Sequence, residues 1–454
     1  MNSLSIKFLG AAQTVTGSCF LLKSKGKQYI IDCGMFQGPD VYKRNYLDFD
    51  FKPSEIDSVF ITHSHLDHCG LLPKLVKQGY EGNIYCTQPT TPLLVEILTD
   101  SAKVQKNNYK YRGVVPLYDS SDTQNTLNRV RSTKFNDAIN IHDINVTFRK
   151  ASHILGASSI EISTGSENVI FSGDLGRRDP SIIEGYDSNF SKEQNVIIME
   201  SLYGNKEHEN RKYGEARLCK IIQHTIDRNG NVIIPVFAIQ RHQEIISLLV
   251  KLIKQGKLPN SVQIFSDTPL GHNILDSYTN NSFYFSKKFK RNKDPFGFSM
   301  KNINFVNSIS QSRRLRKKKG VIILAGSGML EGGRIINHIR SFMKDPKSSF
   351  IIVGFQAEGT LGREIIDGAT SITLNKKQIP INAKIHEIYS FSAHADKNDL
   401  LWWLKRYDTS KISSIFLVHS KKEQADAFKK LATSKLQIKS NKFTIPSIGQ
   451  LHEL

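Results

Sequence analysis

Short apolar or alternating runs recur along the first 200 residues, and glycine, aspartate or histidine follows each of them. Their length and their β-branched side chains predict strands. The clearest cover residues 28–31, 58–62, 146–151, 168–172 and 195–199. Apolar side chains at helical spacing predict helices over residues 71–78 and 93–110. The first part of the chain is therefore predicted to consist mainly of strands, with helices between them.

After Tyr203 strands and helices alternate regularly. Helical patterns cover residues 215–228 and 241–254, and the apolar runs NVIIPVFAI, SVQIFSD, GVIILAGSG and SFIIVGF predict strands. Alternation over about 165 residues is typical of an α/β domain with a mostly parallel sheet. From about residue 371 the strand–loop pattern returns. We therefore predict one α/β domain inserted into another.

The stretch ITHSHLDHCG places His63, His65, Asp67 and His68 directly after a predicted strand. Imidazole and carboxylate are the ligands that zinc prefers where thiolates are absent. A polar loop that caps the next helix is the alternative interpretation, but four ligand types at this spacing favour a metal site. The alternation lets the two first histidines face one ion, while Asp67 and His68 face another.

Other ligand types also follow predicted strands. They are His153, Asp174, His394 and His419. Each alone could be a helix cap or a histidine with a structural hydrogen bond. Together they place ligand types at the ends of several strands, where sites of α/β proteins usually form.

The chain resembles a known family at these residues. The HxHxDH motif (63–68), His153 and the Asp174 of SGD resemble the metallo-β-lactamase fold. MESLYG with Glu200, SAHAD with His394 and LVHS with His419 resemble the three further motifs of its β-CASP branch, and IPVFAIQRHQEI, SGMLEGGR and GFQAEGTLGR resemble that branch's inserted domain. The resemblance covers nearly the whole chain. It is greatest to the RNA-processing nucleases, a group that includes the nuclease subunit of the pre-mRNA 3′-end cleavage complex and its prokaryotic homologues.

This resemblance implies the fold and the metal ligands. The expected fold is an αββα metallo-β-lactamase sandwich, formed by residues 1–204 and 371–454, with an inserted α/β β-CASP domain over residues 205–370. The family pattern implies two Zn2+ ions per chain. His63, His65 and His153 would bind one, Asp67, His68 and His419 the other, and Asp174 would bridge them. Asp32 would orient a ligand.

The resemblance also implies the chemistry. His419 points to RNA, because DNA-processing members generally carry valine there, while Ser420 departs from the glycine common in close relatives. We expect a zinc-dependent ribonuclease with a two-metal hydroxide mechanism, and both an endonuclease and a 5′–3′ exonuclease fit the motifs. His394 would be the general acid, and Glu200 would accept a hydrogen bond from it and keep it protonated.

A phosphate cradle is predicted after the strand GVIILAG, where SGMLEGGR could open a helix at Glu331. Backbone N–H groups of this turn would bind phosphate, together with one arginine. The predicted substrate-binding residues are Ser327, Gly328, Gly332, Gly333 and Arg334.

Charge and composition agree with a nucleic-acid partner. The 62 lysines and arginines exceed the 42 acids, which gives a net charge of +20 and favours a polyanion such as RNA. Residues 283–293 interleave aromatics with cations, a pattern suited to stacking bases beside phosphates, and residues 313–319 form a pure basic run. The default interpretation of both is a solvated face, and contact with RNA is the alternative.

Composition also bears on compartment and partners. The five cysteines include no CxxC pair, which predicts a cytoplasmic protein, and no apolar stretch is long enough to span a membrane. Specificity for RNA would come from partners or from a homodimer. The alternatives to a ribonuclease are a metallo-β-lactamase-fold hydrolase of a small ester, thioester or phosphodiester, and a non-catalytic RNA-binding subunit.

Overall fold

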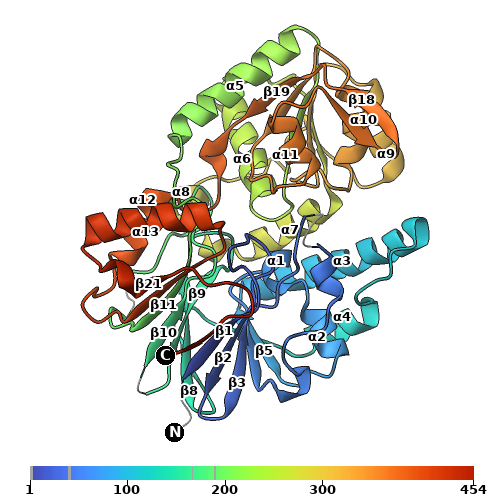
Figure 1. Ribbon diagram of the computed structural model, residues 1–454. Coiled ribbons are helices and arrows are strands. Elements are labelled where there is room, and N and C mark those ends of the chain that lie inside the picture. Colours follow the sequence, from blue (N-terminus) through green and yellow to red (C-terminus); the bar gives the residue numbers. More distant parts are fainter. Residues whose placement is uncertain (1–3, 39–41, 166, 189–190) are drawn as a thin grey trace. The chain divides into compact units, whose positions relative to one another are not determined.

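Two mixed sheets of seven strands each form the larger unit of the computed structural model. The structure describes residues 4–38, 42–165, 167–188 and 191–454. The larger unit contains the chain up to Gln37, Val41–Glu207 and His394–Leu454 (Figure 1). In order across the first sheet, its strands are β22 (Leu451–Glu453), β1 (Ser5–Phe8), β2 (Phe20–Ser24), β3 (Lys27–Ile31), β4 (Ser58–Phe60), β5 (Asn83–Thr87) and β6 (Val130–Thr133).

The second sheet mixes antiparallel and parallel pairs in the same way. In order, its strands are β21 (Phe443–Thr444), β20 (Ser414–Val418), β11 (Val196–Glu200), β10 (Asn168–Phe171), β9 (Ser158–Ser163), β8 (Ile144–Lys150) and β7 (Ala138–Ile141). β10, β11 and β20 run parallel, with Glu200 opposite Val418. The carboxyl ends of these strands therefore meet at one edge of the sheet.

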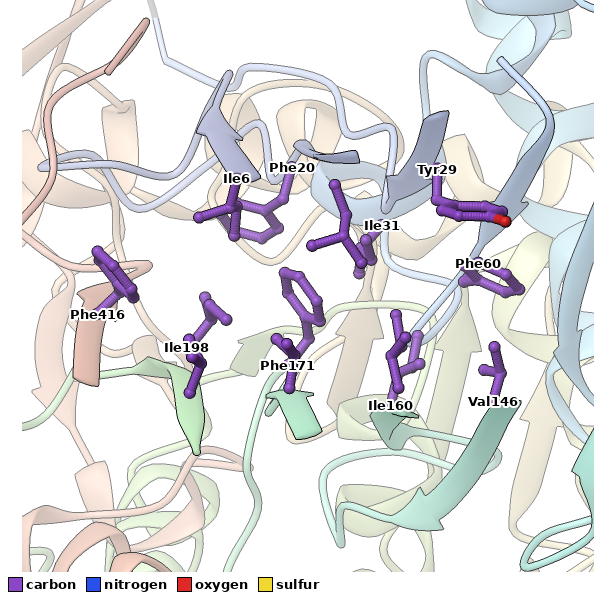
Figure 2. Close-up of a cluster of buried hydrophobic side chains, with 14 of the residues drawn as sticks. Ile6, Phe20, Tyr29, Ile31, Phe60, Val146, Ile160, Phe171, Ile198 and Phe416 are labelled. Atoms are coloured by element: carbon purple, nitrogen blue, oxygen red, sulfur yellow. The ribbon is translucent and has the colours of Figure 1, made fainter. Parts of the chain in front are cut away.

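Apolar side chains of both sheets meet in one core, as Figure 2 shows. The Phe8 and Phe416 rings lie 5.1 Å apart between centroids, and those of Phe20 and Phe171 lie 5.8 Å apart. β8 shows why the strands form, because its sequence INVTFRK places Val146 and Phe148 in the core at a spacing of two. The interior of the sandwich is thus filled from both sheets.

Helices flank the two sheets of this unit (Figure 1). They are α1 (Leu66–Cys69), α2 (Leu72–Lys77), α3 (Thr90–Arg112), α4 (Ser120–Leu127), α12 (Lys397–Leu404) and α13 (Lys422–Leu436), with 3-10 helices η1 (Tyr42–Tyr46), η2 (Pro53–Glu55) and η6 (Ser440–Lys442). The predicted sandwich is confirmed. Among the described residues of the chain, no helix is long and apolar enough to cross a lipid bilayer.

The smaller unit is built from His208–Ala393 around a six-stranded sheet in which every pair is parallel. In order, the strands are β14 (Ile303–Phe305), β13 (Ile264–Asp267), β15 (Ile322–Ala325), β12 (Val232–Pro235), β16 (Ser349–Ile352) and β19 (Lys384–Glu387). The predicted parallel sheet is confirmed. The domain bounds that we inferred from the sequence stay a prediction.

The remaining elements of the smaller unit connect these strands. They are α5 (Arg211–Asp227), α6 (Arg241–Lys254), α7 (Pro269–Asn280), η3 (Ser282–Tyr284), α8 (Lys287–Lys290), α9 (Ile309–Arg314), η4 (Leu315–Lys317), α10 (Ile335–Phe342), α11 (Leu361–Ile366), η5 (Tyr389–Phe391) and the hairpin β17 (Ser371–Leu374)–β18 (Lys377–Pro380).

Candidate metal centre

The HxHxDH motif lies at the end of β4 and runs into the short helix α1. The backbone N–H groups of His68 and Cys69 both donate to the carbonyl oxygen of His65, at 2.9 and 3.0 Å, so α1 begins at Leu66. The sequence predicted a helix only from residue 71. The helix starts earlier because one helical turn closes inside the motif. Asp67 and His68 therefore project from a helix rather than from a turn.

Four donor atoms converge in a first set: Nε2 of His63, Nδ1 of His65, Nε2 of His153 and Oδ2 of Asp174. The nitrogen of His65 lies 3.1 Å from that of His63 and 3.3 Å from that of His153. Asp174 Oδ2 lies 3.5 Å from each of the other two nitrogens. Donors about 2.1 Å from a tetrahedral zinc ion lie about 3.4 Å apart. The spacing of this set therefore fits one metal ion.

A second set of donors surrounds the other oxygen of Asp174. Its Oδ1 atom lies 3.1 Å from Nε2 of His68 and 3.4 Å from Nε2 of His419. Asp67 completes this set, with Oδ2 3.6 Å from the same His419 nitrogen. Each oxygen of Asp174 thus faces a different group of ligands, which is the arrangement of a bridging carboxylate.

Buried polar atoms in this centre lack partners that would satisfy them. Asp174 Oδ1 and Nε2 of His419 are buried and make no well-formed hydrogen bond among the described residues, although ion-pair contacts of 3.1–3.6 Å surround them. A buried polar group left in this state costs about 1–3 kcal/mol. A cation placed between these atoms would satisfy both residues at once, so the donor set fits a divalent metal.

The first set presents neutral imidazoles. Burial lowers the pKa of His65 to about 4. Burial also lowers the pKa values of His63 and His153 well below the ordinary value, and neighbouring imidazoles add to the effect. Only a neutral imidazole binds a metal. These three histidines are therefore ready to bind an ion at neutral pH.

The second set is organised by carboxylates. Burial alone would lower the pKa of His68, but Asp174 and Asp32 outweigh it and hold this pKa well above the ordinary value. Burial would likewise raise the pKa of Asp174, but His419 and His68 hold it well below the ordinary value. In the metal-free protein His68 consequently stays doubly protonated, and a bound cation would replace the proton on the ring nitrogen that faces Asp174.

Asp32 lies directly behind His68. Its Oδ2 atom is 2.7 Å from Nδ1 of His68, and its carboxylate accepts hydrogen bonds from the backbone N–H and the hydroxyl of Thr62, both at 2.8 Å. Thr62 also lies 3.0 Å from Nδ1 of His63. Thr62 was not among the predicted site residues, although a hydroxyl at the last position of the predicted strand, directly before the motif, indicates such a role.

His394 and Glu200 form a pair beside the first donor set. Nδ1 of His394 is 3.3 Å from Oε1 of Glu200 and 3.9 Å from Oδ2 of Asp174. Glu200 is buried at the end of β11 and accepts the backbone N–H of Leu175 at 2.6 Å. The His394 backbone pairs with Gly176. The structure thus brings the predicted general acid and its predicted partner together.

Ser420 also lies against β11. It is buried, and its hydroxyl is 2.7 Å from that of Ser201. The departure from glycine at this position therefore adds a hydrogen bond between the ends of two strands and removes no ligand.

The predicted substrate-binding residues lie in the smaller unit, between β15 and α10. α10 begins at Ile335, not at Glu331 as we predicted, because the Ile335 N–H donates to the carbonyl of Gly326 and the preceding residues form turns. Arg334 donates to the backbone carbonyl of Ser308 at 2.7 Å and lies 3.4 Å from the buried carboxylate of Asp267. The assignment of this loop to phosphate stays a prediction.

The two basic stretches differ in structure. Phe285 and Phe289, which the sequence suggested for base stacking, are buried and pack on each other at 5.1 Å, so they belong to a core. Phe283 is exposed and has Lys290 over its ring. In the second stretch the cations of residues 313–319 are exposed around the buried Leu315. RNA contact by either stretch stays a prediction.

Family models match three parts of the chain: the metallo-beta-lactamase superfamily over residues 13–265, the Beta-Casp domain over residues 242–365, and the Zn-dependent metallo-hydrolase RNA specificity domain over residues 378–442. The chain belongs to the metallo-beta-lactamase superfamily, in the branch that carries a Beta-Casp domain. The predicted family is confirmed.

Relatives of known name support this assignment. The chain is 33% identical over 427 residues to Ribonuclease TTHA0252 of Thermus thermophilus, covering 93% of this chain and 94% of that protein. It is 32% identical over 431 residues to an RNase J-like protein of Methanocaldococcus jannaschii, with the same two coverages. The transcription termination factor FttA of Methanosarcina mazei is 32% identical over 416 residues, which are 88% of this chain and 64% of that protein.

A solved structure shares the fold. It is the crystal structure of a protein of unknown function from Enterococcus faecalis V583, with a TM-score of 0.56, 14% identity and full coverage of both chains. At this identity the match supports the fold alone.

Proposed function

We propose that this protein is a metal-dependent ribonuclease that hydrolyses RNA phosphodiester bonds with two zinc ions. His63, His65 and His153 would bind the first ion, and Asp67, His68 and His419 the second. Asp174 would bridge them. Asp32 would keep His68 in the orientation and tautomer that ligation requires.

One observation carries the proposal: the two oxygens of Asp174 face separate donor sets at 3.1–3.5 Å. A structural zinc site has a single closed set of ligands, whereas hydrolytic centres with two ions share a bridging carboxylate and leave room for water and substrate. The chemistry of the donors, imidazole and carboxylate, suits zinc, and the match to a Zn-dependent metallo-hydrolase RNA specificity domain supports this choice of metal.

When bound, the two ions would polarise the phosphate, lower the pKa of water and offset the negative charge that develops during attack. The chain itself would supply the proton for the departing ribose oxygen. Glu200 holds Nδ1 of His394, which leaves Nε2 as the atom that can donate this proton. Glu200 is itself held by the Leu175 N–H, so the imidazole is positioned before substrate arrives.

RNA is the substrate that this site supports best. The match to an RNA specificity domain covers residues 378–442, which include His394 and His419. Two of the relatives are named as ribonuclease and RNase J-like, and the net charge of +20 suits a polyanion. A small-ester hydrolase would need neither feature. A non-catalytic RNA-binding subunit would have no use for two complete ligand sets.

Cleavage of RNA labelled at either end tests the proposal. Wild-type protein should bind about two zinc ions, as counted by elemental analysis, and cleave the RNA, whereas Asp67→Ala should lose the second ion and turnover. Internal fragments would identify an endonuclease, and mononucleotides released from the 5′ end an exonuclease. Failure of the zinc-loaded wild type to cleave any RNA would overturn the proposal.

Two further predictions concern the whole protein. All five cysteines are buried and unpaired, which is consistent with the predicted cytoplasmic location. The cytoplasmic location and the homodimer stay predictions from the sequence.

A further inference from the structure

The last turns of α3 and the neighbouring η1 expose tyrosines among cations. We call this group the tyrosine–lysine surface: Tyr46, Lys106, Tyr109, Lys110 and Tyr111. Tyr111 is 75% exposed and Tyr109 is 58% exposed. Large aromatic side chains gathered at a surface mark an interaction site more often than a solvated face. In Figure 1 this end of α3 extends away from the first sheet.

Hydrogen bonds hold the parts of this surface together. Gly113 ends α3 in a left-handed conformation, and the chain then folds back, with the Leu117 N–H donating to the Gln105 side chain at 2.8 Å. The hydroxyl of Tyr46 donates to the carbonyl of Val115 at 2.9 Å. η1, the turn after α3 and the helix end therefore form one continuous surface, and the exposed rings are set on a structured base.

The α3 part of this surface carries positive charge only. No aspartate or glutamate occurs between Ser101 and Tyr118 in the sequence. Lys103, Lys106 and Lys110 lie at positions i, i+3 and i+7, so they line one side of the helix at rises of about 4.5 and 6 Å. Lys110 also lies over the ring of Tyr111, at 5.4 Å. Cations that alternate with exposed rings match a partner with phosphates and flat bases.

We propose that the tyrosine–lysine surface binds a single-stranded segment of RNA outside the metal centre, with a base stacked on Tyr111 and phosphates beside Lys106 and Lys110. This inference rests on the proposed function, in which RNA is the substrate. A second copy of the chain fits this surface less well, because a two-fold contact would bring the lysines of both copies together.

The position of the surface sets a length requirement. α3 starts beside the loop of His153, where the hydroxyl of Thr90 donates to the carbonyl of Gly156 at 2.9 Å. Tyr109 lies about 28 Å further along the helix axis. At 3.4 Å or more per nucleotide, at most about eight nucleotides span this distance. An extended strand covers more per nucleotide and needs fewer, so only an RNA of about three nucleotides or less is too short to occupy both the metal centre and the surface.

Fluorescence anisotropy with a labelled oligouridylate of about 20 nucleotides tests the inference directly. The Asp67→Ala protein is the parent, because it keeps the surface and should not consume the probe. Tyr111→Ala should weaken binding about tenfold, within the range known for loss of one base stack, whereas Tyr111→Phe should bind like the parent. Lys106→Ala with Lys110→Ala should reduce the slope of log Kd against log salt concentration by about 1.4.

Tyr213 provides the matched control, since it is 70% exposed and lies on α5 in the other unit. Tyr213→Ala should leave the affinity unchanged. Equal binding by Tyr111→Ala and its parent, or an equal loss in Tyr213→Ala, would overturn the inference. Light scattering gives a further test. If Tyr111→Ala changed the molar mass of the protein but not its RNA affinity, the surface would bind another copy of the chain, and the inference would be overturned.

Kinetics separate this inference from the proposed function. In the otherwise wild-type enzyme, Tyr111→Ala should raise KM for RNA of about 20 nucleotides about tenfold and leave KM for RNA of about three nucleotides unchanged. If the wild type cleaves no RNA but anisotropy still depends on Tyr111, the proposed function fails and the binding surface stands. If the wild type cleaves RNA and both KM values are unchanged, the surface fails and the function stands.

Discussion

Replacing Asp32 by asparagine would test how the second metal set is organised. Asp32 accepts the Thr62 N–H on Oδ1 and faces Nδ1 of His68 with Oδ2. In Asp32→Asn the side-chain oxygen would still accept the Thr62 N–H. The amide NH2 would then take the place of Oδ2 and face Nδ1 of His68. Since an NH2 group only donates, Nδ1 of His68 would have to accept, and the ring proton would move to Nε2. That is the atom that faces Asp174 and the proposed ion.

The expected magnitude follows from this tautomer change. Loss of a partner that orients a metal-ligating histidine typically weakens metal binding 10- to 100-fold, which corresponds to about 1.4–2.7 kcal/mol. The fold should tolerate the change, because asparagine has nearly the same volume and also adopts the left-handed conformation that Asp32 has, with φ 58°. The effect should therefore fall on one ion and not on the stability of the sandwich.

The assay is metal content by elemental analysis after equilibration with a graded series of chelator concentrations. Wild type and Asp32→Asn should release the first-set ion at the same chelator concentration, and the variant should release the other at a concentration about 10- to 100-fold lower. Asp143→Asn is the control, since Asp143 is a carboxylate held by the hydroxyls of Ser24 and Tyr29 in the hairpin between β7 and β8. Identical release curves for Asp32→Asn and wild type would refute the reasoning.

Three further predictions follow from the same centre. His394→Ala should keep both ions in elemental analysis, while its kcat for RNA should fall about 10²- to 10⁴-fold. Glu200→Gln should also lower kcat. Loss of metal in either variant would contradict a role in proton transfer. Gly176→Ala would place a Cβ 1.7 Å from a backbone carbonyl oxygen, so urea denaturation should show about 1–3 kcal/mol less stability. Gly332→Ala, whose added Cβ would have no atom within 4 Å, should change the stability by less than about 0.5 kcal/mol. The pKa of His65 is about 4 in the metal-free folded chain and about 6.5 unfolded, so unfolding takes up a proton between these values. Between pH 6.5 and pH 4 the unfolding free energy of the metal-free wild type should consequently fall by on the order of 3 kcal/mol more than that of metal-free His65→Gln. If the unfolding free energies of both proteins fell equally with pH, His65 would not be buried as a neutral ring.

The sequence was most informative where chemistry and strand ends coincide. Asp174, Glu200 and His419 follow β10, β11 and β20, which are adjacent and parallel, so residues far apart along the chain had to meet at one edge. Most residues of the centre could therefore be predicted from the sequence, because each lies at or just after the end of a predicted strand. The match of motifs to a family then supplied the roles that spacing alone left open.

The sequence was least informative where tertiary packing decides. Phe285 and Phe289 lie near lysines in the sequence as in a stacking surface, yet Phe289 in α8 and Phe285 just before it pack their rings into a core with Phe296. Local spacing does not report which face of a short helix is covered. The same holds for Arg334, because its ion partner Asp267 lies 67 positions earlier on another strand.

The backbone explains why these ligands converge before any ion binds. Four loops of the centre pass through the left-handed region at or just before a functional residue: Asp32 with φ 58°, Ser152 with 61°, Gly173 with 56° and His419 with 54°. Only the glycine adopts this conformation freely, and other residues pay on the order of 1 kcal/mol for it. Such conformations persist only when the surrounding structure over-determines them. Here the fixed strand ends do so, since the N–H of His419 donates to the carbonyl of Ala11 and the N–H of Asp32 to that of Phe60, at 2.6 and 2.9 Å. The two-sheet core therefore supplies the free energy that holds the donors in place, and a metal ion entering the centre would meet donors that are already arranged.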